Sequence, residues 1–102
     1  MIDKTKIISE FMSKAAQSKN CCFDGGTLLK NICDIKRINV WKVEEVSDEK
    51  YDFLLHGCAE FYYAFENDIV NAETEDFNAE VKIGEEGDSV EIYRINIRKR
   101  GY

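Results

Sequence analysis

Residues 51 to 66 read YDFLLHGCAEFYYAFE and alternate between apolar and mixed side chains without a break. Side chains of a β-strand point to opposite faces with a period of two, so this stretch predicts one long strand. One parity is almost wholly apolar and predicts the core side: Tyr51, Phe53, Leu55, Gly57, Ala59, Phe61, Tyr63 and Phe65. The other parity mixes acids with apolar side chains, so we expect any function on that outward face.

A straight strand of this length would measure roughly 54 Å, whereas a compact domain of this size is about 26 Å across. The strand is therefore expected to bend, and Gly57 is the position where a bend costs least. A bent sheet forms a trough for an amphipathic helix. The N-terminal segment predicts such a helix, with Asp3 as its N-cap. Its apolar side chains recur at the spacing of one helical face: Ile7, Ile8, Phe11, Met12, Ala15 and Ala16.

A second, short helix is predicted over residues 28 to 34, after Thr27 as its cap. From Ile38 the apolar period changes to two, which predicts a meander of four strands. The predicted strands are about 38–46, 51–66, 75–83 and 89–98. The alternation slips by one residue near Ile92 and Tyr93, and this predicts a β-bulge.

The sequence thus predicts one α+β domain over residues 1–102. Its helices lie in residues 1–35 and pack on a bent four-stranded antiparallel sheet in residues 38–99. The stretch YDFLLHGCAEFYY, followed by EDFNAEVKIGEEGDSVEI with its hairpin at residues 84–87, resembles the meander of the cystatin-like and nuclear-transport-factor-2-like folds. The glycine-rich inhibitory loop of true cystatins is missing from the sequence. The resemblance implies an architecture that hosts enzymes, ligand cups and binding modules alike.

Charge is distributed unevenly along the chain, whose net charge is −6. Residues 43 to 91 contain sixteen acids and two lysines, whereas the segments before and after are basic. Such a field repels nucleic acid and favours basic proteins, so we expect a basic protein partner and neither direct nucleic-acid nor membrane binding. The alternative is that the acids only keep a β-rich surface soluble.

Residues that could carry catalysis are few. His56 is the only histidine, and Cys58 two residues on lies too far along a strand for a nucleophile–base pair. The spacing of Cys21, Cys22 and Cys33 does not match that of zinc knuckles. Phosphate-loop, dinucleotide and hydrolase motifs do not occur in the sequence. We therefore expect no enzymatic activity, no metal and no cofactor.

A cytoplasmic location with free thiols is expected, because the sequence shows neither an apolar run of 18 residues nor a signal peptide. The hypothesis is a small acidic binding module that blocks a basic partner, in the manner of anti-CRISPR proteins, DNA mimics or immunity proteins. Its predicted contacts are Asp52, Leu54, Glu60, Tyr62, Glu66, Asp76, Glu80 and, on the hairpin, Glu85, Glu86 and Asp88. Two alternatives remain: a small-molecule-binding or enzymatic cup between helix and sheet, and a homodimer formed through Leu54 and Tyr62.

Overall fold

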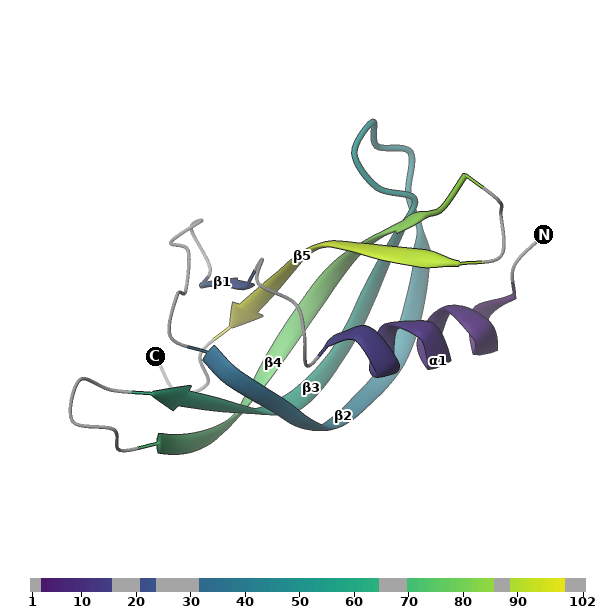
Figure 1. Cartoon of the computed structure of the whole chain (residues 1–102). Coiled ribbons are helices and arrows are strands. Elements are labelled where there is room, and N and C mark those ends of the chain that lie inside the picture. Colours follow the sequence, from purple (N-terminus) through teal and green to yellow (C-terminus); the bar gives the residue numbers. More distant parts are fainter. Residues whose placement is uncertain (1–2, 16–20, 24–31, 65–69, 86–88, 99–102) are drawn as a thin grey trace.

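The computed structural model describes residues 3–15, 21–23, 32–64, 70–85 and 89–98. One helix and five strands follow each other along the chain: α1 (Lys4–Ala15), β1 (Cys21–Phe23), β2 (Ile32–Glu45), β3 (Phe53–Ala64), β4 (Val70–Ile83) and β5 (Val90–Arg98). The strands form one sheet in the order β1-β5-β4-β3-β2 (Figure 1). The predicted α+β class, with an N-terminal helix and four antiparallel strands in a meander, is confirmed.

Strand β1 was not predicted. It pairs in parallel with β5, and Cys22 lies opposite Asn96. Three residues are too few to show a period of their own, so this strand is defined by its partner rather than by its own sequence.

The second predicted helix, residues 28 to 34, lies partly outside the described residues. Its last three residues belong to β2, and there the prediction was wrong. Ile32 is paired with Tyr63 and Asp34 with Tyr62 of β3. Pairing with a neighbouring strand over this length outweighs the weak helical spacing of the local sequence.

Helix α1 begins as the sequence predicts. The Asp3 carboxylate accepts a hydrogen bond from the backbone N–H of Lys6 at 2.8 Å, and this satisfies one of the amides left open at a helix start. Ile7, Phe11 and Ala15 are buried beneath the helix. Met12 was predicted on the same face but is 44% exposed, because the apolar stripe is narrower than the sequence suggested.

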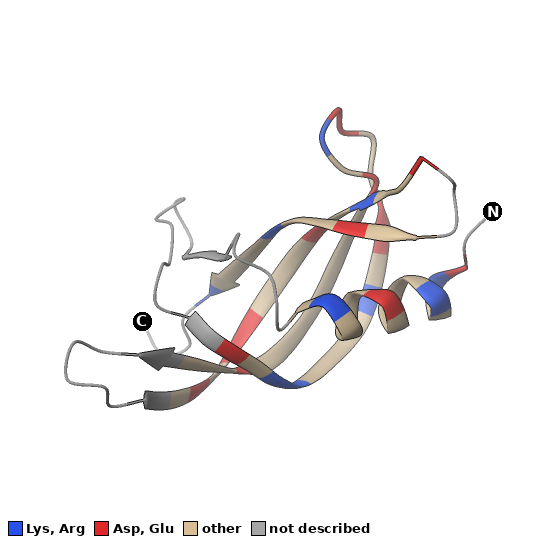
Figure 2. Ribbon diagram, viewed as in Figure 1, with Lys and Arg blue, Asp and Glu red and all other residues tan. Residues whose placement is uncertain are grey.

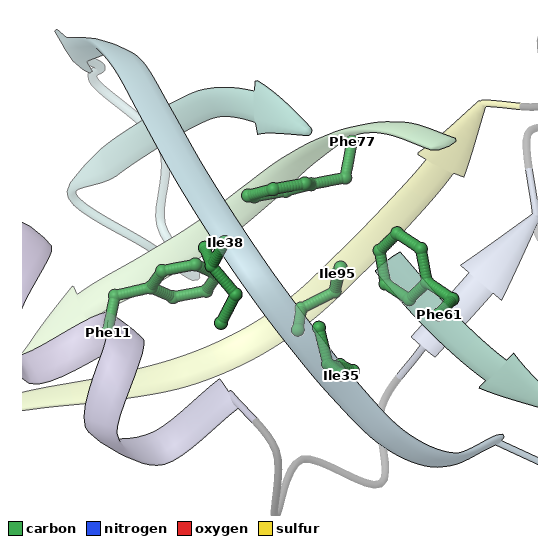
Figure 3. Close-up of a pocket in the computed structure, with 6 residues that line it drawn as sticks. All are labelled: Phe11, Ile35, Ile38, Phe61, Phe77 and Ile95. Atoms are coloured by element: carbon green, nitrogen blue, oxygen red, sulfur yellow. The ribbon is translucent and has the colours of Figure 1, made fainter. Parts of the chain in front are cut away.

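The sheet curves around α1, which contacts both β5 and the edge strand β2 (Figure 1). Two strands separate β5 from β2, so one helix can contact both only because the sheet is bent. The Phe11 ring stacks on Phe77 of β4 at 5.6 Å. Six side chains from the helix and the sheet meet there, drawn in Figure 3: Phe11, Ile35, Ile38, Phe61, Phe77 and Ile95. The space among these apolar groups does not admit a water-sized sphere.

The irregularities that accompany the bend lie in β2 rather than in β3. Strand β3 pairs with β4 without a break, whereas the β2–β3 register shifts three times. One shift lies between Lys36 and Asn39, where Arg37 has a positive φ of 52°. Gly57 is opposite Val40, and a Cβ on it would lie 2.1 Å from the Asn39 carbonyl oxygen. Gly57 thus permits a close approach of the bulged neighbour, since only glycine leaves that space empty.

The bulge predicted in β5 is confirmed. Arg94 is opposite Glu80, while Ile92 is opposite Val81, so Tyr93 is the additional residue. The shift returns Val90 and Ile92 to the core side together with Ile95. Of the helices in the described part of the chain, none is long and apolar enough to cross a membrane.

Candidate protein-interaction surface

The outer face is the side of the sheet opposite α1. Its charges are balanced, because cations of β2 and β5 lie among the acids of the meander (Figure 2). The acids are Asp34, Glu44, Glu60, Asp76 and Glu80, and the bases are Lys36, Arg37, Lys42, Arg94 and Arg98. The sequence predicted an acidic outward face on β3 and β4 alone, and did not anticipate that the basic segments would be placed beside it.

Glu80 is the centre of a buried polar network on this face. It is 5% exposed, and its carboxylate accepts hydrogen bonds from Arg94 Nε at 2.9 Å and from Asn96 Nδ2 at 2.8 Å. Asn96 also donates to Asn78 Oδ1 at 3.0 Å. A buried carboxylate is tolerable when it is paired and hydrogen-bonded in this way. Glu80 therefore joins β4 to β5, and its carboxylate is already engaged by Arg94 and Asn96.

Glu60 and Tyr62 form a second cluster, on β3. The Tyr62 hydroxyl donates a hydrogen bond to the Glu60 carboxylate, and the Lys36 ammonium lies 5.2 Å from the centre of the Tyr62 ring. Arg37 Nε lies 4.0 Å from Glu60. The hydrogen bond to Glu60, followed by burial and by the charge of Glu60, raises the pKa of Tyr62 above its ordinary value of 10.0.

Glu60→Gln is expected to lower the pKa of Tyr62 towards 10.0, because the charged acceptor of its hydroxyl is lost. A group whose pKa is raised by folding stabilises the protein at low pH, and that stabilisation is lost as the pH rises through the folded pKa. Titration of ring-labelled tyrosine by NMR measures the effect residue by residue. Glu44→Gln, which contacts His56 instead, is the control and should leave Tyr62 unchanged. If the pKa of Tyr62 is the same in the wild type and in Glu60→Gln, the hydrogen bond to Glu60 is not the cause of its raised pKa.

His56 contacts a side chain of the neighbouring strand β2. Its Nε2 lies 3.0 Å from Glu44 Oε1. The hydrogen bond to His56 and the nearby charge of Lys42 lower the pKa of Glu44 below 4.5. Cys58 is a free, half-buried thiol. Within the described ranges, no three His, Cys, Asp or Glu side chains are grouped closely enough to hold a metal ion.

The remaining predicted contacts are dispersed. The Asp52 carboxylate accepts a hydrogen bond from the backbone N–H of Ile83 at 2.8 Å, and so extends the β3–β4 pairing. Leu54 is half-buried on the outer face, and Asp76 lies opposite Arg98. Glu85 is exposed in the hairpin turn. Glu66, Glu86 and Asp88 lie outside the described residues.

The acid-rich end is the end of the sheet formed by the turn after β2 and the turn after β4, residues 45–52 and 82–91. Both turns adjoin the same row of the sheet, because Phe53 is paired with Glu45 on one side and with Val81 on the other. The described part of these turns exposes five acids and two lysines: Glu45, Asp48, Glu49, Glu85, Glu91, Lys50 and Lys82 (Figure 2). The excess of negative charge therefore lies at this end rather than on the outer face.

Three aromatic residues were not among the predicted contacts: Trp41, Tyr51 and Tyr93. Trp41, in a β2 bulge, is 58% exposed. Tyr51 was predicted in the core, but it lies before β3 and stacks on Tyr93 with ring centres 6.4 Å apart. A spacing of three residues between the apolar Val40 and Val43 was the only signal of the Trp41 bulge. Tyr51 could not be placed correctly because the strand was assumed to start there.

A comparison of the chain with protein-family models, with curated proteins and with solved structures finds no match in any of the three. The protein is therefore characterised by its architecture alone, an α+β fold with one helix on a curved sheet. The resemblance to cystatin-like and nuclear-transport-factor-2-like folds stays a prediction.

Proposed function

We propose that this protein is a small, non-enzymatic binding module that binds and blocks a basic protein through its acid-rich end. The observation that carries the proposal is the separation of charge. Acids and bases alternate on the outer face, whereas exposed acids outnumber lysines in the two turns that form the acid-rich end. Fields of one sign over a limited surface steer an oppositely charged partner and accelerate its association.

The exposed aromatic residues support the same proposal. Trp41 is more than half exposed, and tyrosine, tryptophan and arginine are the residues that most often dominate binding energy at interfaces. On the outer face, Lys36 is engaged with Asp34 at 3.6 Å and with the Tyr62 ring. We therefore assign long-range attraction to the acid-rich end and anchoring to the aromatic side chains.

The closest functional analogy is to inhibitors that occupy the nucleic-acid site of a basic protein, such as anti-CRISPR proteins and DNA mimics, and to immunity proteins. In such an inhibitor, acidic side chains imitate the row of phosphates of a nucleic acid. We assign that role to the acid-rich end, because the acids of the outer face are interleaved with cations. A cytoplasmic location is part of the proposal. The cup alternative is disfavoured, since the space between α1 and the sheet is filled by apolar side chains (Figure 3).

Charge reversal tests the proposal once a partner has been captured on the immobilised protein at low salt. Glu49→Lys and Glu85→Lys should each slow association with that partner about three- to tenfold at low ionic strength, with a weaker effect as salt is added. Stopped-flow association kinetics measure this directly.

The matched control is Glu73→Lys, an exposed acid of β4 that lies outside the acid-rich end. It changes the net charge by the same amount and should alter the association rate by less than about twofold. Equal effects of all three substitutions would contradict a localised site. If no basic protein is retained, and solution scattering shows a doubled mass that Tyr62→Ala abolishes, the homodimer replaces this proposal.

A further inference from the structure

A hollow of about 530 Å³ opens at the acid-rich end, between the turn after β2 and the strands β4 and β5. It is lined by Ser47, Asp48, Glu49, Lys50, Tyr51, Glu80 and Arg94. Its volume lies within the range of about 300–1,000 Å³ that is usual for ligand sites. The turn is held in place by the Asp52 backbone, which accepts from Val46 N–H and donates to the Val81 carbonyl.

The wall of the hollow already accommodates a guanidinium. Arg94 Cζ lies 5.6 Å from the centre of the Tyr93 ring, and its Nε donates to Glu80. Tyr51 stacks on that same Tyr93 ring, which leaves the aromatic pair beside the acids of the turn. A carboxylate next to an aromatic face is the combination that binds organic cations in proteins.

The sign of the local field decides between a cationic and an anionic ligand. Ser47, Lys50 and Arg94 could together contact an anion, whereas Asp48, Glu49 and Tyr51 could contact a cation. Burial and the charges of Glu80, Asp48 and Glu44 raise the pKa of Tyr51 above 10.0, and the opposing effect of Arg94 is smaller than that of Asp48. The hollow is lined by the three carboxylates of Asp48, Glu49 and Glu80 and by the two cations of Lys50 and Arg94, a formal excess of one negative charge that favours a cation.

We propose that this hollow is the receptor for an arginine side chain of the basic partner, held by the Tyr51 ring and the carboxylates of Asp48 and Glu49. The inference rests on the proposed function and assigns one basic side chain to one place at the acid-rich end. Arginine is favoured over lysine because its planar guanidinium stacks on aromatic rings and donates two parallel hydrogen bonds to a carboxylate.

The probe is N-acetyl-arginine amide. Its binding is monitored by NMR through changes in the backbone amide chemical shifts of the isotopically labelled protein. Saturable shifts are expected at residues 47–51, 80 and 94, and the uncharged isostere N-acetyl-citrulline amide should produce none. Inorganic phosphate is the competing ligand. Saturation of the same residues by phosphate, without saturation by the arginine amide, would overturn the inference.

Two substitutions and one control test the residues. Asp48→Asn keeps an oxygen that can accept from the Lys50 backbone N–H, now at 2.8 Å from Asp48 Oδ1, and removes only the charge. It should weaken binding of the arginine amide about two- to fivefold. Tyr51→Leu should weaken it by a similar factor of about two to five while keeping apolar bulk. Glu10→Gln on α1 removes a charge elsewhere and should have no effect; an effect equal to that of Asp48→Asn would contradict the site.

The two proposals fail separately. If association with the partner responds to Glu49→Lys and Glu85→Lys but the arginine amide does not bind, the hollow is not an arginine receptor and the acid-rich end still is an interface. If the amide saturates residues of the hollow while no basic protein shows charge-dependent association, the hollow binds a guanidinium but the proposed function falls.

Discussion

Phe11→Ala is expected to lower the free energy of unfolding by about 3–5 kcal/mol, the usual cost of truncating a buried phenylalanine. Phe11 is 1% exposed, and its ring stacks on Phe77 in the filled space between α1 and the sheet (Figure 3). Small domains have a total stability of about 5–15 kcal/mol, so this substitution removes a large share. Urea unfolding followed by circular dichroism measures the loss.

Met12→Ala is the matched control, since it is the next residue of the same helix and is 44% exposed. Alanine favours the helix at both positions, so a helix-propensity effect would stabilise both variants. We expect Met12→Ala to change stability by no more than about 0.5 kcal/mol. Similar losses for the two variants would contradict the packing of α1 on the sheet through Phe11.

Gly57→Ala is expected to destabilise the protein by about 1–3 kcal/mol, as other substitutions that overpack a close contact do. The new Cβ would lie 2.1 Å from the Asn39 carbonyl oxygen, which is backbone and cannot rotate away. Strand β2 would therefore have to move from β3. Urea unfolding gives the total effect, and faster amide hydrogen exchange in β2 would locate it.

Gly84→Ala is the control for this prediction. A Cβ at Gly84 would approach Ser89 Oγ at 2.5 Å, but that atom is the end of a side chain that can change rotamer. Its cost should be smaller than that of Gly57→Ala. The close approach of β2 and β3 is refuted if Gly57→Ala is no more destabilising than Gly84→Ala.

Features that depend on local sequence were predicted well. Helix α1 was found from the Asp3 cap and from the apolar spacing of Ile7 and Phe11, because both act within a few residues. The antiparallel meander was found from the alternation of side chains, which records which face of each strand is buried. The β5 bulge at Tyr93 was visible for the same reason, since the extra residue interrupts that alternation.

Features that depend on partners distant in the sequence were not predicted. Ile32 and Asp34 were assigned to a helix, but their hydrogen bonds are made with β3, about thirty residues away. Strand β1 exists only as a partner of β5. The hollow beside Tyr51 also requires three separate segments to meet, and none of them carries a motif.

The charge pattern shows the same division most clearly. The order of residues alone establishes an acidic middle, basic flanks and the alternation that buries one side of each strand. It does not establish which acids remain available to a partner. Pairing of β5 with β4 brings Arg94 to Glu80, and pairing of β2 with β3 brings Arg37 to Glu60, whereas exposed acids still outnumber lysines in the described turns of the acid-rich end. Coulomb interactions depend on distance in space, and strand register sets that distance.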